Sequence, residues 1–137
     1  MRFMMLVKAN TDSEAGIMPE EKLLAAMATY HEELAKAGVL LDASGLQPSK
    51  KGWRIKFAGG KRTVVDGPFA ETKELIAGYT IIQVKSREEA LEWAKRMPNP
   101  AGEKDGEIEI RQLFELEDFA PSESIDRFRE MDATLRK

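Results

Sequence analysis

The sequence predicts an α+β domain with a ferredoxin-like split βαβ topology and an inserted β-hairpin. Two observations carry this prediction: the element order, strand-helix-strand, hairpin, strand-helix-strand, and apolar residues on both faces of two strands. The length of 137 residues, with 42% hydrophobic and 33% charged residues, fits one soluble globular domain with one core. We therefore expect a single domain over residues 1–137, with a core of about residues 1–118 and a C-terminal helix at about 122–136.

The first half of the chain predicts two strands around one helix. Residues 3–7 form the first strand, and residues 10–16 are expected to form a loop. Residues 19–37 predict a helix, which Gly38 ends as a C-terminal cap. Its apolar residues recur at spacings of four, three and four, so one face should be buried: Leu23, Met27, Tyr30 and Leu34. Residues 39–42 read as a short second strand.

The second half begins with a hairpin and ends with a helix. In residues 53–57, aromatic and aliphatic side chains alternate with Arg54 and Lys56, and Gly59-Gly60 turns the chain into residues 62–65. Residues 77–84 predict a strand covered on both faces, followed by a helix that Ser86 caps and Pro98 stops. Residues 108–114 alternate as a last strand. Ser122 is expected to cap the terminal helix, and four apolar residues predict one side of it: Ile125, Phe128, Met131 and Leu135.

The apolar pattern also predicts a partner. Right-handed crossovers place both main helices on one face of the sheet. The opposite face would then lack a cover within the chain, although residues 3–7 and 77–84 are apolar on both faces. Exposed apolar area of that size indicates an interface. We therefore expect a homodimer joined through the sheet face.

Charge is unevenly distributed along the chain. The net charge is −3, but residues 43–65 contain no Asp or Glu and six cations: Lys50, Lys51, Arg54, Lys56, Lys61 and Arg62. This basic stretch suits a small anionic ligand or an acidic partner, or else it protects exposed strand edges from aggregation. The overall acidity argues against direct nucleic-acid binding. Without Cys or a long apolar run, we expect a cytoplasmic protein with no membrane contact.

The segment 66–74, DGPFAETKE, is the strongest candidate for a functional site. It joins two predicted strands and combines a Gly-Pro turn with charged side chains. We expect Asp66 and Glu71 to act as catalytic carboxylates and Lys73 and Glu74 to contact the ligand. The alternative is that Asp66 only satisfies backbone groups of the turn and the other charges pair on the surface.

The remaining polar candidates carry weaker signals. His31, the only histidine, is a candidate ligand-binding residue, or else a helix-flank residue that packs against the core. A metal site is not expected, because the chain has no second His and no Cys. No cofactor is expected either, since Gly59-Gly60-Lys61-Arg62 lacks the spacing of a phosphate loop. Three serines show no nucleophile context: Ser44, Ser49 and Ser122.

Residues 65–79, VDGPFAETKELIAGY, resemble the signature of the DGPF branch of the YCII-related family. The resemblance continues in residues 32–40, 86–98 and 107–119. It implies a ferredoxin-like domain that dimerises as an α/β barrel. Related families include enzymes acting on small ring-cleavage acids and lactones. The YCII branch proper has a proposed His–Asp acid–base pair, but that His lies near the start of the first helix, whereas His31 lies towards its end.

Two functions remain open from the sequence. The first is a small acid–base enzyme that acts on a small organic acid or lactone at the segment 66–74. The second is a non-catalytic ligand-binding or regulatory protein, for example a partner of an extracytoplasmic-function sigma factor, because the resemblance extends to proteins encoded beside such factors. The mismatch at His31 favours the second, and the charged segment between buried strands favours the first.

Overall fold

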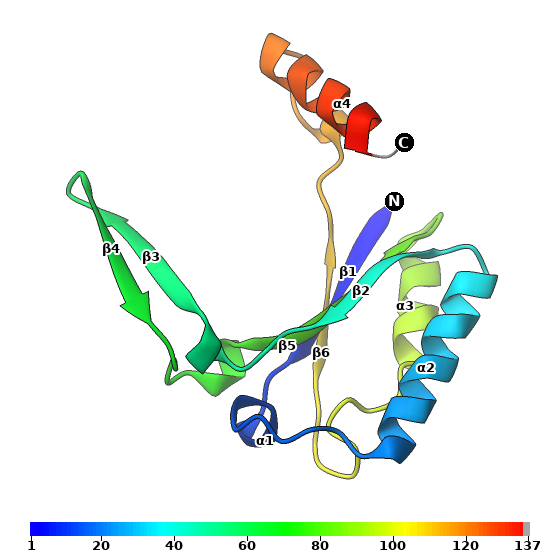
Figure 1. Ribbon diagram of the computed structural model, residues 1–137. Coiled ribbons are helices and arrows are strands. Elements are labelled where there is room, and N and C mark those ends of the chain that lie inside the picture. The colour runs from blue at the N-terminus through cyan, green and yellow to red at the C-terminus, as the bar shows by residue number, and fades with distance from the viewer. Residues whose placement is uncertain (136–137) are drawn as a thin grey trace.

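A computed structural model of the chain describes residues 1–135 and shows a sheet with helices on one side and two projecting arms on the other (Figure 1). The sheet strands are β1 (Arg2–Lys8), β2 (Leu40–Gly45), β5 (Ile76–Gln83) and β6 (Ile108–Gln112). The helices are α1 (Thr11–Glu14), α2 (Glu21–Lys36), α3 (Arg87–Lys95) and α4 (Glu123–Leu135). Strands β3 (Trp53–Ala58) and β4 (Lys61–Asp66) form the hairpin.

The strand order confirms the predicted split βαβ topology. The four-stranded sheet has the order β2-β5-β1-β6, and each neighbouring pair is antiparallel. The hairpin is inserted between β2 and β5 and makes its own two-stranded sheet, in which Ile55 lies opposite Val64. The ferredoxin-like α+β fold with an inserted hairpin is therefore as the sequence predicts.

The core lies between the sheet and the helices α2 and α3, which cover the same face (Figure 1). Met5, Leu34 and Ile82 are completely buried there. Tyr30 is also buried, and its hydroxyl donates a 2.6 Å hydrogen bond to the carbonyl oxygen of Trp93. Burial raises the pKa of Tyr30 to about 12, because the phenolate would lose its hydration.

The predicted stripe on α2 is confirmed at its C-terminal half and only partly at its N-terminal half. Tyr30 and Leu34 are buried, whereas Leu23 and Met27 are half-buried. The helix begins at Glu21, later than the predicted residue 19, and its N-cap Glu20 makes no side-chain capping bond. The first turns of α2 therefore extend past the sheet, where they have less of the core to contact.

Several local predictions differ from the structure. The expected loop at 10–16 contains the short helix α1, because the Asn10 side chain accepts a bond from the Ser13 backbone N–H and Ser13 caps Asn10 in return. Strand β2 runs to Gly45 rather than residue 42, and β6 ends at Gln112 rather than 114. The terminal helix begins after its predicted cap, Ser122, and the expected end at residue 136 lies outside the described residues.

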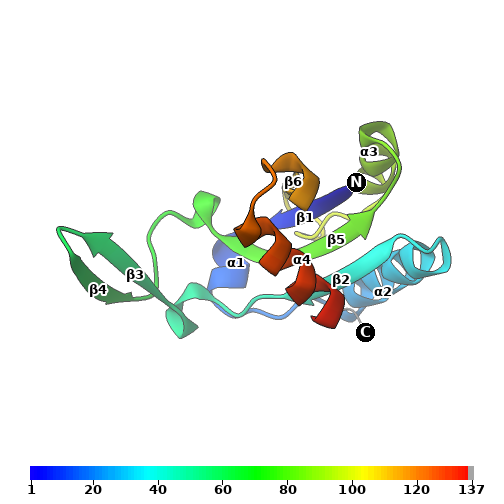
Figure 2. The same ribbon diagram turned by 90° about the horizontal axis from the view of Figure 1, so that it is seen from above.

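Residues 1–135 leave the other face of the sheet open. Its centre consists of apolar, half-buried residues of β1 and β5 in direct cross-strand register, Met4 opposite Ile81 and Leu6 opposite Tyr79. The hairpin and α4 stand apart in two perpendicular views, and both project from the side that α2 and α3 leave open (Figures 1 and 2). Among residues 1–135, no helix is long and apolar enough to cross a membrane.

Candidate functional site

A pocket of about 310 Å³ lies at the base of the hairpin, where the chain enters and leaves it. Its volume is at the lower end of the range for small-molecule sites. The walls come from α1, from the loop between β2 and β3, from β3, and from the segment that follows β4. The lining residues are Glu14, Leu46, Gln47, Pro48, Ser49, Lys51, Gly52, Arg54, Phe69, Leu75 and Ile76, and we call this the hairpin-base pocket.

Hydrogen bonds on Ser49 connect three separate parts of the chain at this pocket. The Ser49 hydroxyl donates a short hydrogen bond to Oε1 of Glu14, and the Ser49 backbone N–H donates to Oε2 at 2.9 Å. The backbone N–H of Phe69 donates to the Ser49 hydroxyl oxygen at 3.1 Å. The Glu14 carboxylate is thus held in a fixed orientation, and a hydroxyl proton lies between it and the segment after β4.

Gly67 allows the segment after β4 to approach this loop. A Cβ atom at Gly67 would lie 1.9 Å from the carbonyl oxygen of Ser49, a distance that real atoms do not reach. The backbone N–H of Gly67 also donates to the carbonyl oxygen of Gly52 at 3.0 Å. Glycine is therefore required here by close packing of two backbones, because any side chain would separate them.

Two cations lie on the walls of the pocket. The guanidinium carbon of Arg54 lies 3.7 Å from the ring centroid of Phe69, so the cation stacks on the aromatic face. Stacking covers the plane of the guanidinium group and leaves its N–H donors directed along the plane, the direction in which carboxylates bind in a bidentate manner. Lys51 adds a second positive charge to the lining. The pocket therefore combines apolar walls with a surface that favours an anion.

The four charged residues predicted in segment 66–74 do not line this pocket. Asp66, Glu71, Lys73 and Glu74 are all exposed, and the segment contributes Phe69 to the lining instead. Thr72–Glu74 form a single 3₁₀ turn, which leads directly into β5. The catalytic roles of Asp66 and Glu71 and the ligand contacts of Lys73 and Glu74 stay predictions.

His31 has partners inside the protein for both ring nitrogens. Nδ1 lies 2.8 Å from the carbonyl oxygen of Met27, and Nε2 lies 2.9 Å from the hydroxyl oxygen of Thr80, which is buried. Because a carbonyl oxygen can only accept, the neutral ring carries its proton on Nδ1 and accepts at Nε2 from Thr80. This geometry fastens α2 to β5. A role of His31 in ligand binding stays a prediction.

Metal-binding geometry is missing from the part of the chain that the structure describes. No group of three or more His, Asp or Glu side chains is placed to hold a metal ion among residues 1–135. The polar groups of the hairpin-base pocket are one carboxylate, a hydroxyl, an amide and two cations, a set that suits an organic anion better than a metal ion.

Sequence reasoning missed the residues that meet in this pocket. Glu14 and Ser49 are 35 positions apart, and Phe69 follows Ser49 by 20 positions, so no periodic pattern connects them. Ser49, which shows no nucleophile context in the sequence, has a carboxylate beside its hydroxyl in the structure. Two signals were available: the basic stretch 43–65, which includes Lys51 and Arg54 and suggested a small anionic ligand, and the candidate segment 66–74, which includes Phe69.

The fold and the pocket define a ferredoxin-like α+β protein with a pocket lined by two cations at the base of an inserted hairpin. The model of the YCII-related domain matches residues 1–117, and the chain belongs to this family. An uncharacterised protein of Rhizobium meliloti (strain 1021) is 32% identical over 94 residues, which cover 69% of this chain and 75% of that protein.

A solved structure also resembles this chain. It is 5-chloro-2-hydroxyhydroquinone dehydrochlorinase (TftG) from Burkholderia phenoliruptrix AC1100 in complex with 2,5-dihydroxybenzoquinone, with a TM-score of 0.48 and 13% sequence identity. The match covers 83% of this chain and 94% of that chain. At this level of similarity, the dehydrochlorinase indicates nothing about the ligand or the reaction of the present protein.

Proposed function

We propose that the protein binds a small organic acid in the hairpin-base pocket and catalyses proton transfer on it. The observation that carries this proposal is the stacked guanidinium of Arg54 in an apolar pocket that also holds the Glu14–Ser49 pair. A carboxylate ligand would gain a bidentate partner in Arg54 and a second cation in Lys51. The volume of about 310 Å³ suits a small acid or lactone rather than a nucleotide.

Glu14 is the proposed general base. Each of its oxygens accepts one hydrogen bond from Ser49, so its orientation is fixed, and each oxygen can still accept a further bond. A proton taken from the bound acid would reside on Glu14 and return to the product, either directly or across the Ser49 hydroxyl. No net oxidation or additional reactant is needed for such an isomerisation.

One feature of the Glu14–Ser49 pair favours a second function. Both oxygens of Glu14 already accept bonds from Ser49, as a purely structural clamp between α1 and the hairpin base would require. In that case the pocket binds an acid without changing it, and the protein is a ligand-binding or regulatory protein. The two functions share the binding step and differ only in proton exchange.

The test separates binding from chemistry. Calorimetry with a panel of short hydroxy, keto and unsaturated acids and their lactones should identify a ligand, and Arg54→Gln should abolish its binding. Lys56→Gln, in the same strand but outside the pocket lining, is the matched control and should bind normally. Equal affinity in Arg54→Gln and the natural protein would refute the proposed site.

Proton transfer is then measured in D₂O. The bound acid should exchange a carbon-bound proton for deuterium, observed by NMR, and Glu14→Gln should stop the exchange while the acid still binds. Exchange that continues unchanged in Glu14→Gln contradicts the role of Glu14. Binding without exchange in the natural protein supports the non-catalytic function instead.

We also propose that the protein is a homodimer through the open face of the sheet, in the manner of a dimeric α/β barrel. Met4, Leu6 and Ile81 give this face an apolar centre, and Tyr79 donates a 2.8 Å hydrogen bond to Asp42 near its edge. An apolar centre with a polar rim is the usual anatomy of an interface. Light scattering should give twice the chain mass, and Ile81→Glu should give a monomer.

A further inference from the structure

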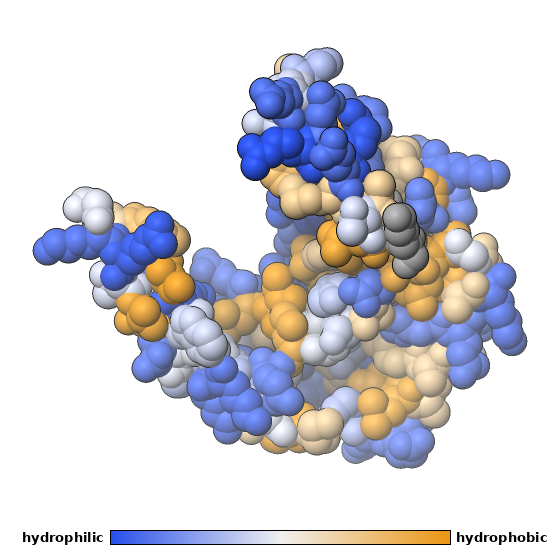
Figure 3. Space-filling model, turned by 45° about the horizontal axis from the view of Figure 1, so that its top comes forward, coloured by the Kyte–Doolittle hydropathy of each residue, from blue (hydrophilic) through white to orange (hydrophobic). Residues whose placement is uncertain are grey.

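Both projecting arms carry apolar surface that the described part of the chain leaves uncovered. On the hairpin, one face gathers an aromatic and aliphatic set, which we call the hairpin face: Trp53, Ile55, Phe57 and Val64. Trp53 is 64% exposed and Phe57 is 69% exposed. Figure 3 shows hydrophobic surface on the hairpin arm and in the hollow between this arm and α4. Contiguous apolar surface of this kind indicates an interface.

The helix α4 carries a matching stripe. Its apolar residues recur at helical spacing and form what we call the α4 stripe: Ile125, Phe128, Met131 and Leu135. Phe128 is 54% exposed and Leu135 is 81% exposed. A helix of 13 residues gains most of its stability from packing an amphipathic face rather than from its own hydrogen bonds. The α4 stripe therefore requires a partner surface.

The two arms have opposite charge. The hairpin, residues 53–66, has four cations, Arg54, Lys56, Lys61 and Arg62, and one carboxylate, Asp66, a net charge of +3. The helix α4, Glu123–Leu135, has two arginines and four carboxylates, a net charge of −2. These carboxylates are Glu123, Asp126, Glu130 and Asp132. A hairpin and an α4 would thus attract each other, whereas two hairpins or two α4 helices would repel.

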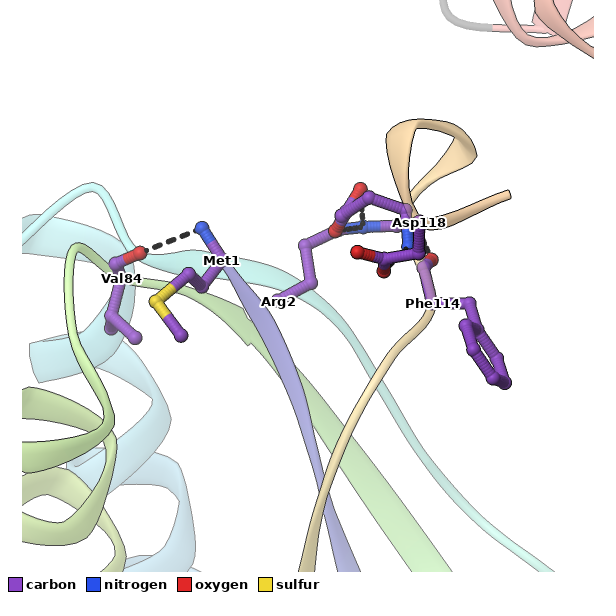
Figure 4. Close-up of polar contacts among 6 residues, drawn as sticks. Met1, Arg2, Val84, Phe114 and Asp118 are labelled. Atoms are coloured by element: carbon purple, nitrogen blue, oxygen red, sulfur yellow. Dashed lines mark hydrogen bonds and ion pairs between the residues drawn. The ribbon is translucent and has the colours of Figure 1, made fainter. Parts of the chain in front are cut away.

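Both arms are fixed at their bases. Nε of Arg2 forms a 2.8 Å ion pair with Glu115, and the Arg2 guanidinium also donates to the carbonyl oxygen of Phe114 at 3.2 Å (Figure 4). These bonds attach the segment before α4 to the start of β1. The hairpin is attached through Ser49 and Gly67, as described above. These contacts fix where each arm leaves the domain, which lowers part of the entropic cost of docking.

The positions of the arms leave two symmetric ways to dock a second copy. The arms project from the same side of the sheet and stand apart from each other (Figures 1 and 3). A two-fold axis between facing sheets either pairs like arm with like arm or pairs each hairpin with the partner's α4. Like pairing places net +3 against net +3 and net −2 against net −2. Charge therefore selects the second arrangement.

We propose that, in the dimer, the hairpin face of each protomer docks onto the α4 stripe of its partner. The dimer then contains two equivalent hairpin–α4 contacts. The proposal rests on the homodimer through the sheet face and adds which arms meet. One partner, a second copy of this chain, then explains why both apolar sets are exposed and why the two arms have opposite charge. The contact is isologous and closes, because each copy uses both of its arms.

The natural absence of cysteine allows a direct test. Val64→Cys and Met131→Cys are made as separate single variants, mixed to exchange protomers, and oxidised. The mixture should give a disulfide-linked product of twice the chain mass, which neither variant gives alone. Thr63→Cys, beside Val64 but on the opposite face of the hairpin, is the matched control and should not crosslink to Met131→Cys.

The outcomes separate the arm contact from the dimer itself. Light scattering of each unoxidised variant reports whether the dimer has formed. A dimer in which Val64→Cys crosslinks to itself, or in which the mixture gives no linked product, overturns the arm contact and leaves the sheet-face dimer intact. A monomer in every sample overturns the dimer, and the arm contact with it.

Discussion

Replacing Gly67 with Ala should open the hairpin base, because two backbones meet there without room for a methyl group. The added Cβ would lie 1.9 Å from the Ser49 carbonyl oxygen and 2.7 Å from the Ser49 carbonyl carbon. Both neighbours are backbone atoms, so neither can rotate away. The loop before β3 and the segment after β4 must separate until the contact reaches an ordinary distance of at least 3.4 Å.

The cost follows from the bonds that this separation breaks. The Gly67 N–H bond to Gly52 O and the Phe69 N–H bond to the Ser49 hydroxyl, 3.0 Å and 3.1 Å long, would both be lost. At roughly 0.5–1.5 kcal/mol each, the free energy of unfolding should fall by about 1–3 kcal/mol. For a chain of this size the melting temperature should fall by roughly 4–12 °C. Affinity for an acid in the pocket should fall as well, since Phe69 no longer supports Arg54.

Gly52→Ala provides the matched control in the same loop. Its Cβ would lie 3.6 Å from the same Ser49 carbonyl oxygen, an ordinary contact, and its φ of −121° suits any residue. Scanning calorimetry and ligand titration should therefore show Gly52→Ala close to the natural protein and Gly67→Ala clearly below it. Equal melting temperatures for the two variants would refute the close-packing argument.

Three further outcomes follow from the core and from the predicted site residues. Leu34→Ala, at a completely buried position, should lower the free energy of unfolding by about 2–5 kcal/mol in denaturant titration, and an unchanged midpoint would contradict the assigned stripe. Because the pKa of Tyr30 rises from 10.0 unfolded to about 12 folded, its neutral form stabilises the fold below pH 10, and that stability should be lost as pH rises towards 12. Denaturation curves of Tyr30→Phe should lack this loss. His31→Gln and Asp66→Asn should both leave ligand affinity nearly unchanged in calorimetry. A strong loss of affinity in Asp66→Asn would instead support the carboxylate role predicted from the sequence.

The fold was predictable from the sequence because its elements depend on local periodicity. Leu34 and Ile82 are buried because a 3.6-residue repeat and a two-residue repeat direct them towards one core. The caps at Ser86 and Ser122 were also visible, since each needs only residues within one turn. The short helix α1 was missed because a single polar turn has no apolar stripe and is held by the Asn10–Ser13 capping bonds alone.

The site was much less predictable, because its contacts connect residues that are distant along the chain. Nothing near Glu14 indicates that it meets Ser49, and the motif around Asp66 directs attention to its charges. In the structure, the same motif contributes its glycine and its aromatic residue to the pocket: Gly67 permits the close approach and Phe69 supports Arg54. The glycine matters because two backbones approach each other, and the aromatic ring matters because a cation stacks on it. Neither role is visible until the segment that packs against the motif is known.

Strand β3 connects the two proposals through the alternation of its side chains. Arg54 lines the hairpin-base pocket, whereas Trp53 and Ile55 belong to the hairpin face, because successive side chains of a strand point to opposite sides. A ligand that holds Arg54 would hold the strand, and docking of the partner's α4 would hold the same strand from the other side. Each event then lowers the ordering cost of the other, and this coupling must be reciprocal. Light scattering over a dilution series should therefore show a lower dissociation concentration when the acid is present. An identical dilution curve with and without the acid would show that β3 is equally rigid in both states and that the two sites are independent.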